Sequence, residues 1–134
     1  MNAPVTAEIP AEFQECFALQ QAAWRGNRNP SLQERRADLR ALHAMVSENQ
    51  DAFVKAVNRD FGCRSGFETR ATELLQVMEA ARDAIRKLRK WMRPVRRHLD
   101  PTQYPLARAW TFPQPVGVVG IVVPWNFPIA MAVQ

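Results

Sequence analysis

Near the end of the chain, residues 116–123 form an unbroken apolar run, Val-Gly-Val-Val-Gly-Ile-Val-Val, and the turn sequence Pro-Trp-Asn-Phe-Pro follows at once. A strand with one face in water alternates apolar and polar residues, so this run predicts a strand buried on both faces, as in a parallel sheet. Parallel strands are joined by crossovers of about a dozen residues or more, and none is left after this run. We therefore expect an α/β fold of which the chain is a fragment, holding only the first strand of the sheet.

The residues before this run have helical spacing. Helices are predicted at residues 10–25, 31–46, 51–60 and 69–92, and Gly62 is interpreted as the residue that terminates the third. Ser31 followed three residues later by Glu34 is a capping-box pattern, which marks the start of the second helix. In the last helix an apolar stripe steps by four and three residues alternately; its members are Leu74, Met78, Ala81, Ile85, Leu88 and Met92. Residues 107–112 fit a strand, and Pro128 fits the first turn of a further helix.

The net charge of +5 is concentrated in one segment. Residues 82–97 contain eight basic side chains against one aspartate, a local charge of +7, so the rest of the chain sums to −2. Such a run favours a solvated helix end that complements the helix dipole. The alternative is a stand-alone helical module that binds an anionic partner through residues 82–97.

Cysteine usage and hydropathy point to the cytoplasm. Cys16 and Cys63 have no Cys-x-x-Cys spacing, so we expect two reduced thiols. The N-terminus lacks the cationic and apolar regions of a signal peptide, and the longest apolar run is about half of a membrane span of roughly 20 residues. His43 and His98 have no partner at ligand spacing, and no metal site is expected.

Asn126 is the candidate catalytic residue. Ligands of open α/β sheets bind beyond the carboxyl ends of the strands, and Asn126 follows the predicted strand directly. Prolines on both sides limit its backbone freedom, and its amide can donate two hydrogen bonds. A donor held in this way suits the stabilisation of a developing oxyanion. The alternative is a turn asparagine that caps the helix beginning near Pro128.

The sequence resembles the N-terminal part of an NAD(P)-dependent aldehyde dehydrogenase. The resemblance covers most of residues 30–134 and rests on Pro115-x-Gly117-Val118 and on the Pro-Trp-Asn-Phe-Pro turn, with Arg36, Leu39, Asp60 and Trp91-Met92 upstream. The segment Arg-Lys-Trp-Met-Arg-Pro followed by Pro-Gln-Pro-x-Gly resembles the class 3-like branch, particularly bacterial coniferyl-aldehyde dehydrogenases. The family resemblance implies a helical region at residues 1–100. From 101 to 134 it implies the start of a Rossmann-like NAD(P)-binding domain.

The resemblance also implies a mechanism. A cysteine thiolate attacks a small-molecule aldehyde, and the oxyanion is held by the Asn126 side chain and a backbone amide. Hydride passes to NAD or NADP, and a glutamate activates the water that hydrolyses the thioester. The backbone of Val122, Val123 and Pro124, together with Trp125, lines the cofactor cleft. Neither cysteine of this chain has the context of the nucleophile, so the chain alone is expected to be inactive.

The resemblance implies a homodimer for the full-length protein, and neither a nucleic-acid partner nor a membrane span is expected. Gly117 and Gly120 give Gly-x-x-Gly, not the Gly-x-Gly-x-x-Gly of a dinucleotide-binding turn. They lie within the predicted strand, so we interpret them as positions where another backbone or side chain approaches closely.

Overall fold

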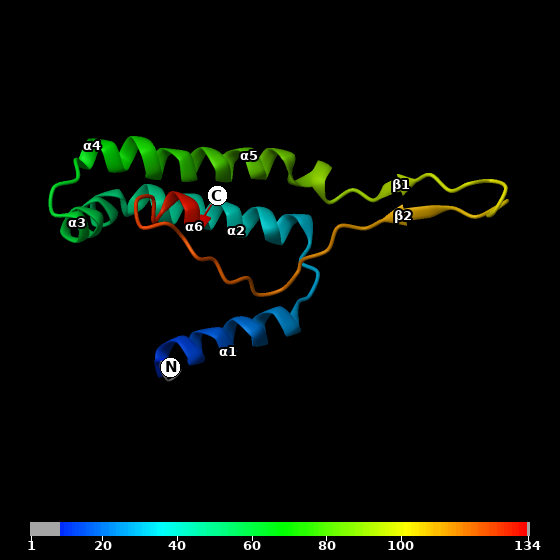
Figure 1. Cartoon of the computed structure of the whole chain (residues 1–134), viewed down its shortest axis with the longest axis horizontal. Helices are drawn as coiled ribbons and strands as arrows, with labels where there is room; N and C mark the ends of the chain where they lie inside the picture. Colours follow the sequence, from blue (N-terminus) through cyan, green and yellow to red (C-terminus); the bar gives the residue numbers. More distant parts are fainter. Residues whose placement is uncertain (1–8, 134) are drawn as a thin grey trace, which may run out of the picture. The chain divides into compact units, whose positions relative to one another are not determined.

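Helices make up most of the chain (Figure 1), and the computed structural model describes residues 9–133. In chain order the elements are α1 (Ala11–Gly26), α2 (Leu32–Glu48), α3 (Gln50–Phe61), α4 (Gly66–Thr69), a π-helical turn η1 (Arg70–Leu74), α5 (Leu75–Trp91), β1 (Val95–Arg97), β2 (Ala109–Thr111) and α6 (Ala130–Val133). The first unit contains residues 9–29 and Pro115–Gly120; the second contains Pro30–Gln114 and residues 121–133. Among residues 9–133 no helix combines the length and the hydropathy needed to cross a bilayer.

Two helix boundaries have the local causes that the sequence predicts. At the start of α2, the Glu34 amide donates to Ser31 Oγ (3.2 Å) and the Ser31 amide donates to the Glu34 carboxylate (2.7 Å), so the capping box is confirmed. At the end of α3, Gly62 has a φ of +77°, a left-handed conformation that glycine adopts without steric cost.

The core of the second unit lies between α2 and α5, which run side by side (Figure 1). Val46, Leu74 and Val77 are fully buried. Other apolar side chains pack against these three; they are Phe53, Val54, Met78, Ile129 and Val133. Arg36 of α2 also donates to the backbone carbonyl of Ile85 in α5 (3.2 Å). Two side chains from the α6 region therefore belong to the same core as the long helices.

The single helix predicted at residues 69–92 is interrupted by η1. A π turn contains one more residue per hydrogen-bonded ring than an α turn, so it changes which positions face inward. The residues buried there are Glu73, Leu74, Val77 and Ala81. The predicted stripe named Leu74 and Ala81 but missed Val77, which lies three residues after Leu74, and Glu73, which is charged.

Strands β1 and β2 form an antiparallel hairpin that extends beyond the end of α5 (Figure 1). Val95 pairs with Thr111 and Arg97 with Ala109. Strand β2 lies within the strand predicted at 107–112, whereas β1 was not predicted. In the connecting loop, the Thr102 hydroxyl and amide both donate to Asp100 Oδ1, which lowers the pKa of that carboxyl group.

Residues 116–123 are not a strand in this structure, contrary to the prediction. They have no regular secondary structure, and Val116 (85% exposed) and Val122 (100% exposed) lie open to solvent. A parallel strand needs a neighbour that completes its hydrogen bonds, and the two strands within residues 9–133 pair with each other. The apolar run therefore has no sheet to join among the described residues.

In the first unit, Gly117 packs closely against Trp24. Its φ is +101°, and a Cβ atom at this position would lie 3.3 Å from the Trp24 ring. The interpretation of Gly117 as a close-packing glycine is confirmed. The same interpretation is wrong for Gly120, because a Cβ there would meet no atom within 4 Å among the described residues.

Candidate functional site

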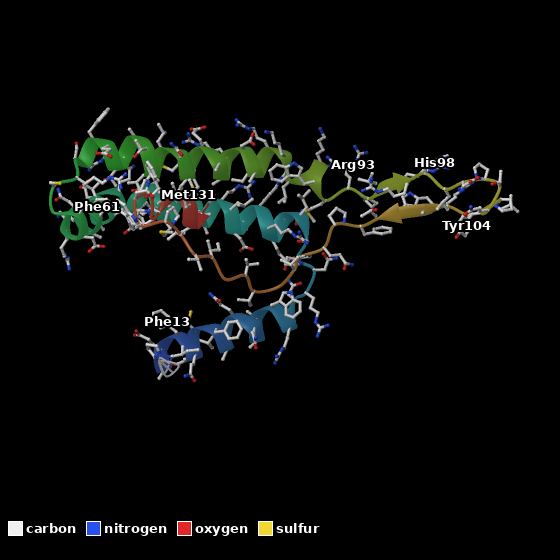
Figure 2. The ribbon with its side chains drawn as sticks, in the orientation of Figure 1. Phe13, Phe61, Arg93, His98, Tyr104 and Met131 are labelled. Carbon is white, nitrogen blue, oxygen red and sulfur yellow. The ribbon has the colours of Figure 1, made fainter. Side chains whose placement is uncertain are left out.

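The Asn126 turn connects the extended segment at 121–124 to α6. Trp125 (81% exposed) and Asn126 lie on the surface of the second unit. Within residues 9–133 the side-chain amide of Asn126 makes no hydrogen bond. The backbone of the turn, by contrast, is hydrogen-bonded by two charged side chains, one at Asn126 and one at Ile129 and Ala130. Figure 2 shows the side chains of this region, with Phe61 of α3 and Met131 of α6 labelled.

Arg64 is the first of the two charged side chains. It lies in the loop between α3 and α4, and its side chain is 4% exposed. Its Nη1 donates to the carbonyl oxygen of Asn126 (2.8 Å), and its Nη2 donates to the Thr72 hydroxyl of η1 (3.3 Å). The guanidinium carbon also lies 5.0 Å from the ring centre of Phe61 and 5.4 Å from that of Phe127. Arg64 is thus enclosed by aromatic rings and fixed to the turn.

Glu73 of η1 is the second, and its side chain is fully buried. Its Oε2 accepts hydrogen bonds from the backbone amides of Ile129 (2.7 Å) and Ala130 (3.3 Å). Its Oε1 lies 3.0 Å from Arg64 Nη1 but accepts no hydrogen bond within the described residues. The contact between the two charges is therefore Coulombic. The hydrogen bonds that the two side chains make to the turn go to its backbone on either side of Phe127 and Pro128.

These contacts bear on the alternative interpretation of Asn126 as a residue that caps α6. The backbone amides of Ile129 and Ala130 bind the Glu73 carboxylate. The amide of Met131 donates to the carbonyl of Phe127 (3.3 Å). The Asn126 side chain does not cap α6, and its amide is available to another acceptor.

The residues predicted to line a cofactor cleft lead directly into this turn. Val122 is 100% exposed, Val123 is half-buried, and Pro124 is exposed. The Trp125 ring is tilted by 40° to Phe61, with ring centres 6.1 Å apart. The four residues form one consecutive strip, in which all but Val123 are exposed.

Neither Arg64 nor Glu73 was predicted from the sequence as a residue of this site. A usable signal was present for Glu73, which stands four residues before Val77 on a helix, so the two side chains share a face. A carboxylate on a buried face needs a buried partner. Arg64 had no comparable signal, because it lies in a loop.

Neither cysteine lies near this turn in the sequence, and both are exposed and unpaired. Across residues 9–133 there is no cluster of three histidine, cysteine, aspartate or glutamate side chains that could hold a metal ion.

The basic side chains of α5 are exposed, and several form ion pairs along the helix. Arg82 pairs with Glu79 (2.6 Å), and Lys87 and Arg86 pair with Asp83 (2.6 and 3.6 Å).

The chain belongs to the aldehyde dehydrogenase family, whose sequence pattern it matches over residues 3–134. It is 34% identical over 122 residues to a probable coniferyl aldehyde dehydrogenase of Pseudomonas aeruginosa, an alignment that covers 91% of this chain and 25% of that protein. It is 38% identical over 89 residues to a coniferyl aldehyde dehydrogenase of Pseudomonas sp. HR199 (66% and 18%). It is 34% identical over 123 residues to aldehyde dehydrogenase family 3 member F1 of Arabidopsis thaliana (92% and 24%). The chain spans about a quarter or less of the length of these relatives.

Proposed function

We propose that this chain is the N-terminal part of an NAD(P)-dependent aldehyde dehydrogenase in which the Asn126 side chain donates a hydrogen bond to the oxyanion. The observation that supports this most directly is the geometry of the turn. Arg64 binds the Asn126 carbonyl and Glu73 binds the amides of Ile129 and Ala130. The side-chain amide stays exposed, so a donor on a fixed backbone faces outward without competing partners. Such preorganisation is what makes an oxyanion donor effective.

In the proposed reaction, a cysteine thiolate from outside this chain adds to the aldehyde carbon. The carbonyl π electrons move to oxygen, and the Asn126 amide stabilises the resulting alkoxide of the thiohemiacetal. NAD(P), when bound, supplies the acceptor for the hydride that leaves this carbon. Water activated by a glutamate, also from outside this chain, then releases the carboxylic acid and regenerates the thiol.

The strip formed by Val122, Val123, Pro124 and Trp125 fits the wall of a cofactor cleft. Val122 and the Trp125 ring offer exposed apolar and aromatic surface of the kind that lines cofactor pockets. In the whole protein these residues would hold the cofactor beside Asn126.

We further propose that residues 116–123 become the first strand of a parallel, Rossmann-like sheet in the whole protein. Residues 1–100 would then be a helical region and residues 101–134 the start of the NAD(P)-binding domain. The substrate proposed is an aromatic aldehyde such as coniferyl aldehyde, and the whole enzyme is proposed to be a cytoplasmic homodimer. The names of the relatives from the two Pseudomonas strains support this substrate class.

Replacing Asn126 by alanine in the full-length protein tests the proposed role. Removing one oxyanion donor typically lowers kcat by about 10²–10³, so Asn126→Ala should reduce turnover by that factor. A matched control is Asn58→Ala, because Asn58 is exposed on α3 and should leave kcat unchanged. Near-normal turnover of Asn126→Ala would rule out the role. The 134-residue chain alone should not reduce NAD or NADP with any aldehyde.

A further inference from the structure

We infer that Arg64 and Glu73 are positioning residues that fix where the Asn126 amide stands, an inference that rests on the proposed function of Asn126. Both side chains are buried at the base of the turn, at 4% and 0% exposure. Neither reaches the surface where the Asn126 amide lies, so neither can touch the reacting atoms. Their action on the reaction would pass through the backbone of the turn.

The hydrogen bonds hold the turn on both sides. Arg64 binds the carbonyl of Asn126 itself (2.8 Å), which restricts rotation of that peptide group. Glu73 binds the amides of Ile129 and Ala130, which fixes the exit of the turn. The turn that carries Asn126 is thus tied to the loop after α3 through Arg64 and to η1 through Glu73.

The cost of burying the pair indicates a role besides stability. Replacing a buried ion pair by apolar residues of similar size is often neutral or stabilising, so burial alone is weak evidence of a stabilising role. Here three of the pair's hydrogen bonds go to the backbone of the same turn. Glu73 faces inward from a π turn, a distortion that is frequent at functional sites.

A shift of about 1 Å in a group that acts on the reacting atoms can cost roughly 10²-fold in rate. Loss of either charged side chain should therefore lower kcat by about 10- to 10²-fold. The KM for the aldehyde should change by less than about twofold, because a transition-state interaction is the one weakened.

The test uses the full-length enzyme with Arg64→Met and Glu73→Gln, each with and without Asn126→Ala. Arg70→Met is the matched control, because Arg70 lies in η1, is 42% exposed and pairs with the exposed Asp51 at the surface. Turnover is normalised to the amount of folded protein, measured by far-ultraviolet circular dichroism. Unfolded protein then does not lower the measured kcat.

Where Asn126 is retained, Arg64→Met and Glu73→Gln should each lower kcat. Combined with Asn126→Ala, either change should cause little further loss. Arg70→Met should leave kcat unchanged. Equal losses with and without Asn126→Ala, or an unchanged kcat for both Arg64→Met and Glu73→Gln, would overturn the inference while leaving the proposed function intact. An unchanged kcat for Asn126→Ala alone would overturn the proposed function and this inference with it. If Arg64→Met does not fold, the kcat values of Arg64→Lys and Glu73→Gln test the positioning role instead. Lysine keeps the charge but lacks the planar fork that reaches Asn126 and Thr72 together, so it should restore part of the lost turnover.

Discussion

Removing one member of the buried Arg64–Glu73 pair is expected to destabilise the chain more than removing both. The perturbation is a double-mutant cycle of Arg64→Met, Glu73→Met and the combined variant. Methionine fills a similar length with an unbranched apolar side chain. The cycle therefore removes charge with little change in packing.

The magnitudes follow from the surroundings of each charge. With Arg64 removed, the fully buried Glu73 keeps two backbone amide donors but loses its cation. With Glu73 removed, the carboxylate that Arg64 keeps among the described residues is that of Glu68 at 3.5 Å, whose side chain is 53% exposed and screened by water. Leaving a buried charge without its partner costs about 3–5 kcal/mol. The double variant leaves no charge and loses the hydrogen bonds to the turn, which costs about 1–3 kcal/mol.

Urea unfolding followed by far-ultraviolet circular dichroism measures the free energy of unfolding of each variant. The reasoning predicts a coupling free energy of at least about 3 kcal/mol, since the two single losses sum to about 6–10 kcal/mol. Single variants that each lose less than about 1 kcal/mol would show that the charges are solvated. A double variant whose loss equals the sum of the two would show that they do not interact.

Three further predictions concern the fold. Leu74→Ala should lower the free energy of unfolding by about 3–5 kcal/mol, because Leu74 is fully buried. Leu75→Ala, at a 48% exposed position, should lower it far less. Similar losses for both variants in a urea titration would contradict the assigned core. Gly62→Ala should cost about 1–2 kcal/mol, because its φ of +77° is unfavourable for a residue with a Cβ; an unchanged unfolding midpoint would show that this conformation is not required. The Asp100 carboxyl should titrate below its ordinary range in an NMR experiment, because Thr102 donates to its charged form, and Thr102→Val should raise that pKa. A lowered folded-state pKa gives stability that is present above the unfolded pKa and is lost as the pH falls through the folded pKa.

Local signals predicted the helices because each signal acts within a few residues. The Ser31–Glu34 capping box and the left-handed Gly62 depend on no distant part of the chain. The same is true of the position of Asn126, since the turn sequence itself places it after an apolar segment.

The features that could not be predicted depend on contacts between distant residues. Arg64 meets Asn126 across 62 positions, and Glu73 meets Ile129 across 56. No local pattern encodes such a pairing, although the position of Glu73 four residues before Val77 was a local signal for a buried carboxylate. The strand predicted at 116–123 did not form because its hydrogen-bonding neighbours are not among the described residues.

The 62-residue separation between Arg64 and the Asn126 carbonyl has a consequence for folding during synthesis. Chains emerge from the ribosome N-terminus first, so α2 to α5 can pack together before residues 121–133 appear. During that interval Arg64 and Glu73 have no turn to bind, and the apolar surface that receives Ile129 and Val133 is open. When the turn is synthesised, it can pack on this surface and bury Arg64 and Glu73. Asn126 can therefore reach its final position only after the helices before it have been synthesised.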